Sequence, residues 1–398
     1  MKILWCHEVS YLEKPVYEYQ DFPERLAGRG HQVEVIDFRE VGPVPADSVP
    51  VSRTGEGTVT LTAIPHDNRP GLKYIQARAN FRRMLEERLH RGDVDAVFVY
   101  SVFINGTQAV RLSRRYGVPV VYRVLDAYHR LRPGLLTRSI LWLGERFIYR
   151  SADRVLVTNE QMGDYVSQVA GTDVGARTVV VDHGVDSVHF APRLPDQELR
   201  DRHGLCDGDT VALFLGTTYA FSGLAPLVRR LPAALQQCPS LKLVIVGGGE
   251  LDDELATLVD ELGLAGRVVL TGMVDYQHVP RYLSLATLAL NPFELNEITR
   301  DIIPIKILQY QAAALPVLST PLPDLARKHR PGISGVEYSS SDDPDAFLAK
   351  MLDLLADPAQ LRMAGRRGLA FVNECFSVEH AVDRIEATLT QLREEIAP

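Results

Sequence analysis

The chain has 398 residues, of which 46% are hydrophobic and 24% charged, and its net charge is -8. This length suits two domains that each bury a core, and the composition is that of an ordinary globular protein. No segment approaches 18 uncharged apolar residues and the start MKILWC has no signal-peptide pattern, so we expect no membrane span and a cytoplasmic location.

The first half alternates short apolar strands with amphipathic helices, which predicts a doubly wound parallel α/β sheet. We expect strands at 2–5, 32–38, 95–100, 119–125, 154–158 and 179–181, with a further strand at 58–64 inside an irregular insertion. We expect helices at 21–30, 72–91, 106–116 and 134–152.

The helix at 72–91 is rich in basic residues. Residues 67–150 carry 16 Lys/Arg against 7 Asp/Glu, a net +9 on an acidic protein. This pattern is typical of a solvated helix face, or of a surface that meets an anionic partner such as phospholipid. Residues 73–91 could thus make a peripheral contact with the inner face of the cell membrane. No nucleic-acid-binding motif accompanies the arginines, so we expect no nucleic-acid partner.

The second half repeats the alternation. We expect strands at 210–216, 241–246, 267–271, 288–292 and 316–320, and helices at 224–237, 250–262, 279–286, 343–355, 358–375 and 378–395. Between the last two strands lie a polar loop at 296–301 and a further helix that begins near Pro304 and carries Lys306 in its first turn. A lysine at a helix N-terminus suits an anionic phosphate group, although a solvated lysine is the simpler reading.

The segment from Pro304 to Val317 resembles the donor-binding segment of two-domain GT-B glycosyltransferases, which reads roughly P-x-K-x-x-E-Y-x-A-x-G-x-P-V. The matching positions are Pro304, Lys306, Tyr310, Ala312, Pro316 and Val317. Gln309 replaces the second glutamate and Leu315 the glycine. The K-x-x-Q-Y form is similar to that of the xanthan-type glucuronosyltransferases, the GumK-like group, in which this lysine and glutamine contact the sugar nucleotide.

The resemblance implies two Rossmann-like domains facing a cleft. The expected divisions are an acceptor-binding domain at 1–190, a linker at 191–208, a nucleotide-sugar-binding domain at 209–375, and a C-terminal helix at 376–398 that packs on the first domain. Two further segments, ERFIYRSADRVLVTNEQM and HGVDSVHF, resemble the end of the first domain in this family.

The donor site is expected in loops that follow strands of the second domain. The candidates are Gly216, Thr217, Thr218, Gly247, Met273, Phe293, Glu294, Lys306 and Gln309. Related enzymes carry a G-R-x-x-x-K-G loop after the first strand of this domain, and residues 216–223 lack both basic residues. This departure shifts the grip on the diphosphate to Lys306, with Arg123 and Arg300 as helpers. Gln309 would bond a hydroxyl without repelling an anionic sugar.

Asp126 is the candidate base. It follows the predicted strand at 119–125, and the resemblance places the catalytic aspartate of the glucuronosyltransferase group here. A buried aspartate with a raised pKa would suit this role, whereas a helix-capping carboxylate is the alternative. His7, Glu8 and His129 are the acceptor-side candidates, and a histidine in such a place is otherwise structural.

The leading interpretation is a metal-independent glycosyltransferase that moves a sugar, such as a uronic acid, from a UDP-sugar to a hydroxyl of a lipid-linked or small glycoside acceptor, with inversion. No cofactor is expected, and the four cysteines, Cys6, Cys206, Cys238 and Cys375, are too dispersed for a metal site. A non-catalytic nucleotide-sugar-binding partner protein and a sugar-nucleotide epimerase of the same fold are the alternatives.

Overall fold

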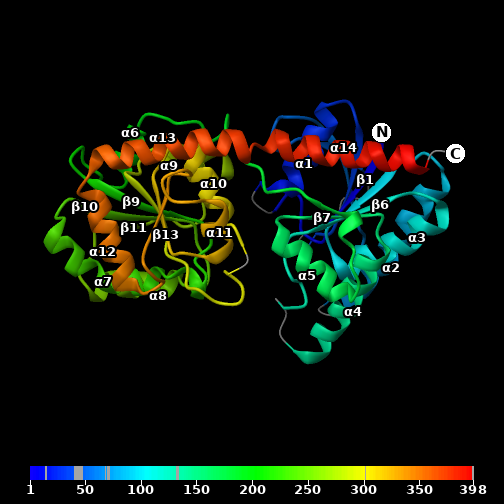
Figure 1. The fold of residues 1–398 in the computed structure, drawn as a ribbon, viewed down its shortest axis with the longest axis horizontal. Coiled ribbons are helices and arrows are strands. Elements are labelled where there is room, and N and C mark those ends of the chain that lie inside the picture. The colour runs from blue at the N-terminus through cyan, green and yellow to red at the C-terminus, as the bar shows by residue number, and fades with distance from the viewer. Residues whose placement is uncertain are drawn as a thin grey trace. The chain divides into compact units, whose positions relative to one another are not determined.

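The computed structural model describes residues 1–13, 16–39, 48–67, 69, 72–130, 134–300 and 302–396. The chain forms two compact units: unit 1 is Met1–His183 together with the chain from Glu379 onward, and unit 2 is Gly184–Val378. Each unit has its own sheet with helices on both faces (Figure 1). The predicted class, α/β with two Rossmann-like doubly wound domains, is confirmed.

Unit 1 is built on an 8-stranded sheet in the order β3-β4-β2-β1-β5-β6-β7-β8. Its strands are β1 (Lys2–Cys6), β2 (Gln32–Asp37), β3 (Val49–Val51), β4 (Val59–Ala63), β5 (Ala96–Val99), β6 (Val120–Val124), β7 (Arg154–Val157) and β8 (Thr178–Val180). Its helices are α1 (Glu18–Gly28), α2 (Leu72–His90), α3 (Thr107–Tyr116), α4 (Leu135–Ser151), α5 (Glu160–Ala170) and α14 (Val378–Ile396), with short turns η1 (Val102–Gly106) and η2 (Gly175–Arg177). All strand pairs are parallel except β3 with β4.

Unit 2 is built on a 6-stranded parallel sheet in the order β11-β10-β9-β12-β13-β14. Its strands are β9 (Thr210–Leu215), β10 (Leu241–Val246), β11 (Val268–Leu270), β12 (Leu288–Asn291), β13 (Val317–Ser319) and β14 (Val336–Tyr338). Its helices are α6 (Gln197–Arg202), α7 (Leu224–Gln237), α8 (Asp252–Glu261), α9 (Val279–Leu283), α10 (Ile305–Ala312), α11 (Pro323–Lys328), α12 (Pro344–Leu355) and α13 (Pro358–Cys375), with turns η3 (Ala220–Ser222) and η4 (Tyr276–His278).

Each sheet has a point at which the strand order reverses. In unit 1 this switch point lies between β1 and β5, and in unit 2 it lies between β9 and β12. Loops diverge there at the carboxyl ends of the strands, so a crevice forms in which ligands of open α/β sheets bind. The two switch points therefore direct attention to the loops after β1, β5, β9 and β12.

Among the described residues, the α-helices and strands that the sequence pattern does not predict are β3, α5, α6, α11 and β14. β3 and β14 have three residues each, and α6 and α11 have six, which is too short for a hydrophobic period to be visible. α5 is longer, and its start is fixed by Asn159, whose side chain accepts a hydrogen bond from the Met162 N–H at 2.7 Å.

The boundaries of the units differ from those predicted. Unit 1 ends at His183 rather than at 190, because Val185 and Phe190 are buried in the core of unit 2. The predicted linker, 191–208, is also part of unit 2, since Leu199 and Leu205 belong to the same core. The strand at 58–64 is observed as β4, and Pro232 lies inside α7 without dividing it.

The last helix, α14, packs against α1 within unit 1 (Figure 1). Arg29 of α1 lies 2.7 Å from the Asp383 carboxylate and 2.8 Å from that of Glu386, and His31 also meets Glu386 at 2.8 Å. Arg154 pairs with Glu395 further along the helix. None of the helices, over the residues the structure describes, is long and apolar enough to cross a bilayer.

Candidate active site

The switch point of unit 2 is organised around the start of α10. The Tyr310 hydroxyl accepts a hydrogen bond from the Leu215 N–H at 2.7 Å and donates to the Leu290 carbonyl at 3.2 Å. It thus bridges the ends of β9 and β12 where these strands diverge. The buried phenol satisfies backbone groups that the separating strands leave unpaired, and it fixes α10 with its first turn at the carboxyl edge of the sheet.

Lys306, in that first turn, is buried with only 7% of its surface exposed. Its Nζ lies 3.7 Å from the ring centroid of Phe214 and 4.2 Å from that of Phe293. Within the described part of the chain this nitrogen has no hydrogen-bond partner. Burial lowers the Lys306 pKa well below its ordinary value. An amine held over two aromatic rings, with no counter-ion among the described residues, would regain its charge beside an incoming anion.

Gly216 leaves room for this lysine. A Cβ added to Gly216 would lie 3.2 Å from Lys306 Nζ, and its φ of 128° is one that other residues rarely adopt. Gly216 therefore lets the β9 loop approach the ammonium group closely. The structure thus brings together Gly216, Phe293 and Lys306, three of the predicted donor residues.

The remaining donor candidates lie around the same edge with different surroundings. Thr218 is buried and its hydroxyl donates to Asp252 at 2.7 Å, and the Gly247 N–H donates to the Gly272 carbonyl at 3.1 Å. Met273 is 67% exposed, Glu294 is exposed, and Gln309 is half-buried on α10. Thr217 is half-buried beside Gly216.

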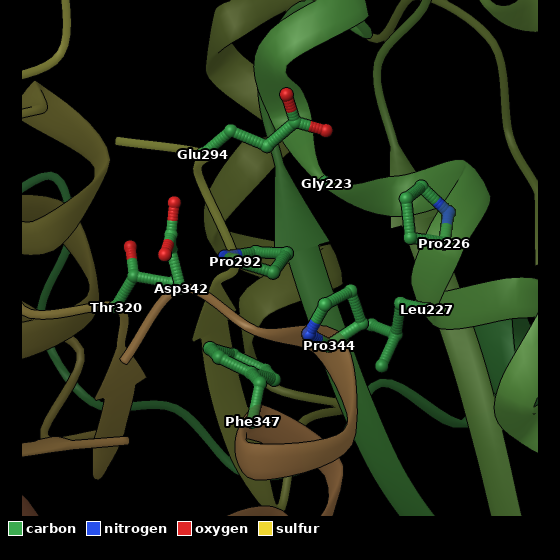
Figure 2. Close-up of a pocket in the computed structure, with 9 residues that line it drawn as sticks. All are labelled: Gly223, Pro226, Leu227, Pro292, Glu294, Thr320, Asp342, Pro344 and Phe347. Atoms are coloured by element: carbon green, nitrogen blue, oxygen red, sulfur yellow. The ribbon is translucent and has the colours of Figure 1, made fainter. Parts of the chain in front are cut away.

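A pocket of unit 2 opens beside this edge, at the starts of α7 and α12. It is lined by Gly223, Pro226, Leu227, Pro292, Glu294, Thr320, Asp342, Pro344 and Phe347. Figure 2 shows the Glu294 carboxylate turned away from Pro292 and Phe347, toward the rim. Of the predicted donor residues this pocket contains Glu294, whereas Lys306 and Gln309 are not among its lining residues.

In unit 1, Asp126 follows β6 at the carboxyl edge of the sheet and is half-buried. Burial raises the pKa of its carboxyl group, His183 opposes this shift, and Glu18 adds to it. A carboxylate with a raised pKa holds a proton more readily than an ordinary aspartate, as a general base requires. The position and the direction of the shift are both compatible with the predicted role.

Behind Asp126 lies a buried ionic network that sequence reasoning missed. Arg123 is fully buried, and its guanidinium donates to both Glu18 oxygens at 3.0 Å and to the Val181 carbonyl at 2.6 Å. Glu18 also meets His183 Nδ1 at 3.1 Å. Burial acts to raise the Glu18 pKa, but Arg123 and His183 outweigh it and lower the pKa to about 2.

The prediction that Arg123 helps to bind the diphosphate is therefore wrong. Its N–H groups already bind Glu18 and Val181 inside unit 1. The sequence of β6, VVYRV, could not reveal this, since an arginine in an otherwise apolar strand is equally compatible with a position in a cleft. The available signal was the acidic start of α1 at Glu18.

The three acceptor-side candidates have structural surroundings. His7 is fully buried, neither ring nitrogen has a partner within the described residues, and burial lowers its pKa to about 4. The Glu8 carboxylate accepts from the backbone N–H groups of Ile104 and Asn105 at the start of η1. His129 Nδ1 meets the buried Glu145 carboxylate at 2.6 Å. The sequence shows none of these contacts, since the partners lie far away along the chain or on a different element.

No group of three or more His, Cys, Asp or Glu side chains that could hold a metal ion is present among the residues the structure describes. The carboxyl edges of the two sheets carry the buried Lys306 amine in unit 2 and the Asp126 carboxyl group, with its raised pKa, in unit 1. The first group suits the binding of an anionic donor, and the second suits the removal of a proton from an acceptor hydroxyl.

Comparison with known proteins agrees with this arrangement. Residues 20–184 match the family model described as "Glycosyl transferase 4-like domain", and residues 209–357 match "Glycosyl transferases group 1". The GDP-mannose-dependent alpha-(1-6)-phosphatidylinositol monomannoside mannosyltransferase of Mycolicibacterium smegmatis is 30% identical over 190 residues. That match covers 46% of this chain and 49% of the mannosyltransferase, so the chain spans about half the length of this curated relative.

Two solved structures share the fold over nearly the whole chain. The sucrose-phosphate synthase of Thermosynechococcus elongatus has a TM-score of 0.77 at 18% identity, covering 99% of this chain and 100% of that one. The HepE protein of Anabaena in complex with UDP-glucose has a TM-score of 0.71 at 17% identity, covering 98% and 100%.

The two switch-point sites and these similarities define the class of the protein, which is that of the GT-B glycosyltransferases. Within that class, the chain belongs to the family whose two domains are described as glycosyl transferase 4-like and glycosyl transferases group 1.

Proposed function

We propose that the chain transfers a sugar from a nucleotide-sugar donor, UDP-linked, to a hydroxyl group of an acceptor. The observation that carries this proposal is Lys306: its buried amine nitrogen lies at the switch point of unit 2 without a hydrogen-bond partner among the described residues, and a donor diphosphate there would supply the counter-charge for its protonated form. Gln309, on the same helix, would bond a ribose or sugar hydroxyl. The proposed reaction is metal-independent, and Lys306, once protonated, offsets part of the negative charge of the leaving diphosphate.

The donor sugar is proposed to be a uronic acid, in keeping with the K-x-x-Q-Y resemblance to the GumK-like group. Gln309 supports this, because an amide in place of a glutamate removes one negative charge from the donor side. The loop from Gly216 to Gly223 has no arginine or lysine, so Lys306 carries the interaction with the diphosphate. Similar proteins differ in their donors: the mannosyltransferase is named for GDP-mannose, and the HepE structure contains UDP-glucose.

Asp126 is proposed as the base of a single inverting displacement. Its carboxylate would take the proton of the acceptor hydroxyl while that oxygen attacks the anomeric carbon and the bond to the diphosphate breaks. The acceptor is proposed to be lipid-linked, in line with the basic surface of residues 73–91, which we propose lies against the cytoplasmic face of a membrane. A small soluble glycoside is the second candidate acceptor.

The test is ligand-induced thermal stabilisation with UDP, GDP, dTDP and their sugars. A ligand at about 100 times its Kd stabilises the native state by about 2.7 kcal/mol, so a specific donor gives a distinct shift. A larger shift with UDP-glucuronic or UDP-galacturonic acid than with UDP-glucose is the expected result. A preference for GDP or dTDP would discard the UDP assignment, and no shift with any nucleotide would favour a non-catalytic role.

A further inference from the structure

The first half of α4 exposes an unusual number of large apolar side chains. Leu135 is 82% exposed, Leu136 76%, Ile140 48%, Leu143 58% and Trp142 36%. We call these five residues the α4 patch. With 3.6 residues per turn, they fall on one side of the helix over less than half of its circumference. Figure 1 shows the start of α4 extending beyond α2, α3 and α5.

A second exposed apolar group lies on α2, where Ile75 is 63% exposed and Tyr74 41%. α2 and α4 pack on the same short turn, η1: Arg78 of α2 donates to the Phe103 carbonyl, and a Cβ added to Gly144 of α4 would lie 2.6 Å from Val102. Both helices therefore begin at the carboxyl edge of the unit 1 sheet, the edge that also carries Asp126.

The exposed charges of α4 itself are of one sign. The only carboxylate of α4, Glu145, is buried against His129, whereas Arg138 and Arg150 are exposed. The Arg146 guanidinium lies 5.3 Å from the Trp142 ring. Arg111 of α3 lies 5.0 Å from the Phe147 ring, at the side of the same helix. A cationic rim around leucine, isoleucine and tryptophan is the composition of a helix that lies in the headgroup region of an anionic bilayer.

We infer that the α4 patch inserts into the surface of an anionic phospholipid bilayer, with the surrounding arginines on the headgroups. A second copy of the chain fits less well, because an isologous dimer would place this cationic rim against itself. The inference deepens the proposed function, since it would hold the carboxyl edge of unit 1 against the surface that contains a lipid-linked acceptor. It rests on that function for its purpose, and its test needs neither donor nor acceptor.

Tryptophan fluorescence that responds to lipid would come almost entirely from the α4 patch. The chain has 2 tryptophans, of which Trp5 is fully buried and stacked on Phe98, so a lipid-induced change of emission comes from Trp142. We expect vesicles of phosphatidylglycerol and phosphatidylcholine to shift the emission to shorter wavelength, and brominated lipid to quench it. Vesicles of phosphatidylcholine alone should have much less effect, and added salt should weaken the binding.

The matched variants are Leu136→Glu with Leu143→Glu, against Leu194→Glu as control. Leu194 is 90% exposed and lies in unit 2, so the same substitution is made at an equally exposed leucine away from α4. The affinity of the double variant for anionic vesicles, measured by flotation, should fall about tenfold or more. The affinity of the control should be unchanged. All three proteins should keep their thermal midpoint, and their stabilisation by UDP should match wild type.

The inference is overturned if wild-type protein fails to bind anionic vesicles, or if the double variant binds them as well as the control does. Self-association in sedimentation that the double substitution abolishes would assign the patch to a second copy instead. Failure of the proposed function has a different signature, the absence of a nucleotide-induced shift, which is independent of vesicle binding.

Discussion

Lys306 Nζ lies 3.7 Å from the ring centroid of Phe214, inside unit 2. The protein therefore keeps a buried amine in an environment that disfavours its charged form, as the lowered pKa shows. Such an arrangement lowers the stability of the ligand-free state, and a bound diphosphate would remove the penalty.

Lys306→Met should therefore separate stability from binding. We expect the variant to be more stable than wild type at neutral pH by about 1–3 kcal/mol, because an unpaired buried polar group is replaced by an apolar one of similar shape. Its affinity for UDP should fall roughly tenfold or more, the loss of one charge-assisted bond. Chemical denaturation and calorimetric titration measure the two effects.

Lys350→Met is the matched control for this substitution. Lys350 belongs to unit 2 and pairs with Asp353 on the surface of α12, so neither stability nor UDP affinity should change appreciably. A loss of stability in Lys306→Met would mean that the lysine has a partner in the native protein.

Donor binding should be coupled to proton uptake. The Lys306 pKa is lowered in the free protein, and an adjacent diphosphate raises it toward its ordinary value. Affinity should thus decline as the pH rises from the pKa of the free state to that of the complex. Calorimetry in buffers of different ionisation enthalpy would count the protons taken up, and a proton count that is unchanged in Lys306→Met would contradict this mechanism.

Asp126→Asn should abolish most turnover without loss of donor binding. Removal of a general base typically costs about 10²–10⁴-fold in rate, so we expect a fall of that size in kcat with an unchanged UDP-induced thermal shift. In wild type, the acid limb of the rate profile should lie above the usual range of an aspartate, because burial raises the Asp126 pKa. Asp164→Asn, at an exposed position of α5, serves as the control.

The buried carboxyl group of Asp37 should make the stability of the folded protein, rather than catalysis, depend on pH. This carboxyl group is fully buried, Oδ1 accepts from the Tyr11 N–H at 2.9 Å, and burial raises its pKa to about 7. The pKa of Asp37 is higher in the folded state than in the unfolded state. Its contribution to stability is therefore complete at pH values below the unfolded-state pKa, and it is lost as the pH rises toward and through 7.

Asp37→Asn should consequently stabilise the protein by about 1–3 kcal/mol at pH 8 and have little effect at pH 4, since the amide keeps the acceptor for Tyr11 and carries no charge. Denaturant titrations of both proteins at the two pH values test this expectation. Equal differences at both pH values would show that Asp37 does not titrate in this interval.

The sheets were predictable because their strands contain continuous apolar runs, as in the stretch from Leu243 to Val246, and buried parallel strands have this pattern. The site was predictable only in part. Asp126 follows a strand and Lys306 lies in the first turn of a helix, and any doubly wound sheet places both kinds of position at its carboxyl edge. The environment of Lys306 depends on Phe214, which is far away in the sequence, and the pairing of Arg123 with Glu18 joins residues 105 positions apart. Such contacts have no local signature.

The return of α14 to unit 1 has a consequence for how the protein is made. Asp383 and Glu386, which pair with Arg29, follow all of unit 2 along the chain and therefore leave the ribosome after it. During synthesis unit 2 can fold from a continuous segment, but unit 1 must wait for α14 with its α1 surface uncovered. A premature stop codon shortly before Glu379 would thus damage unit 1 and spare unit 2, although the stop lies at the end of unit 2.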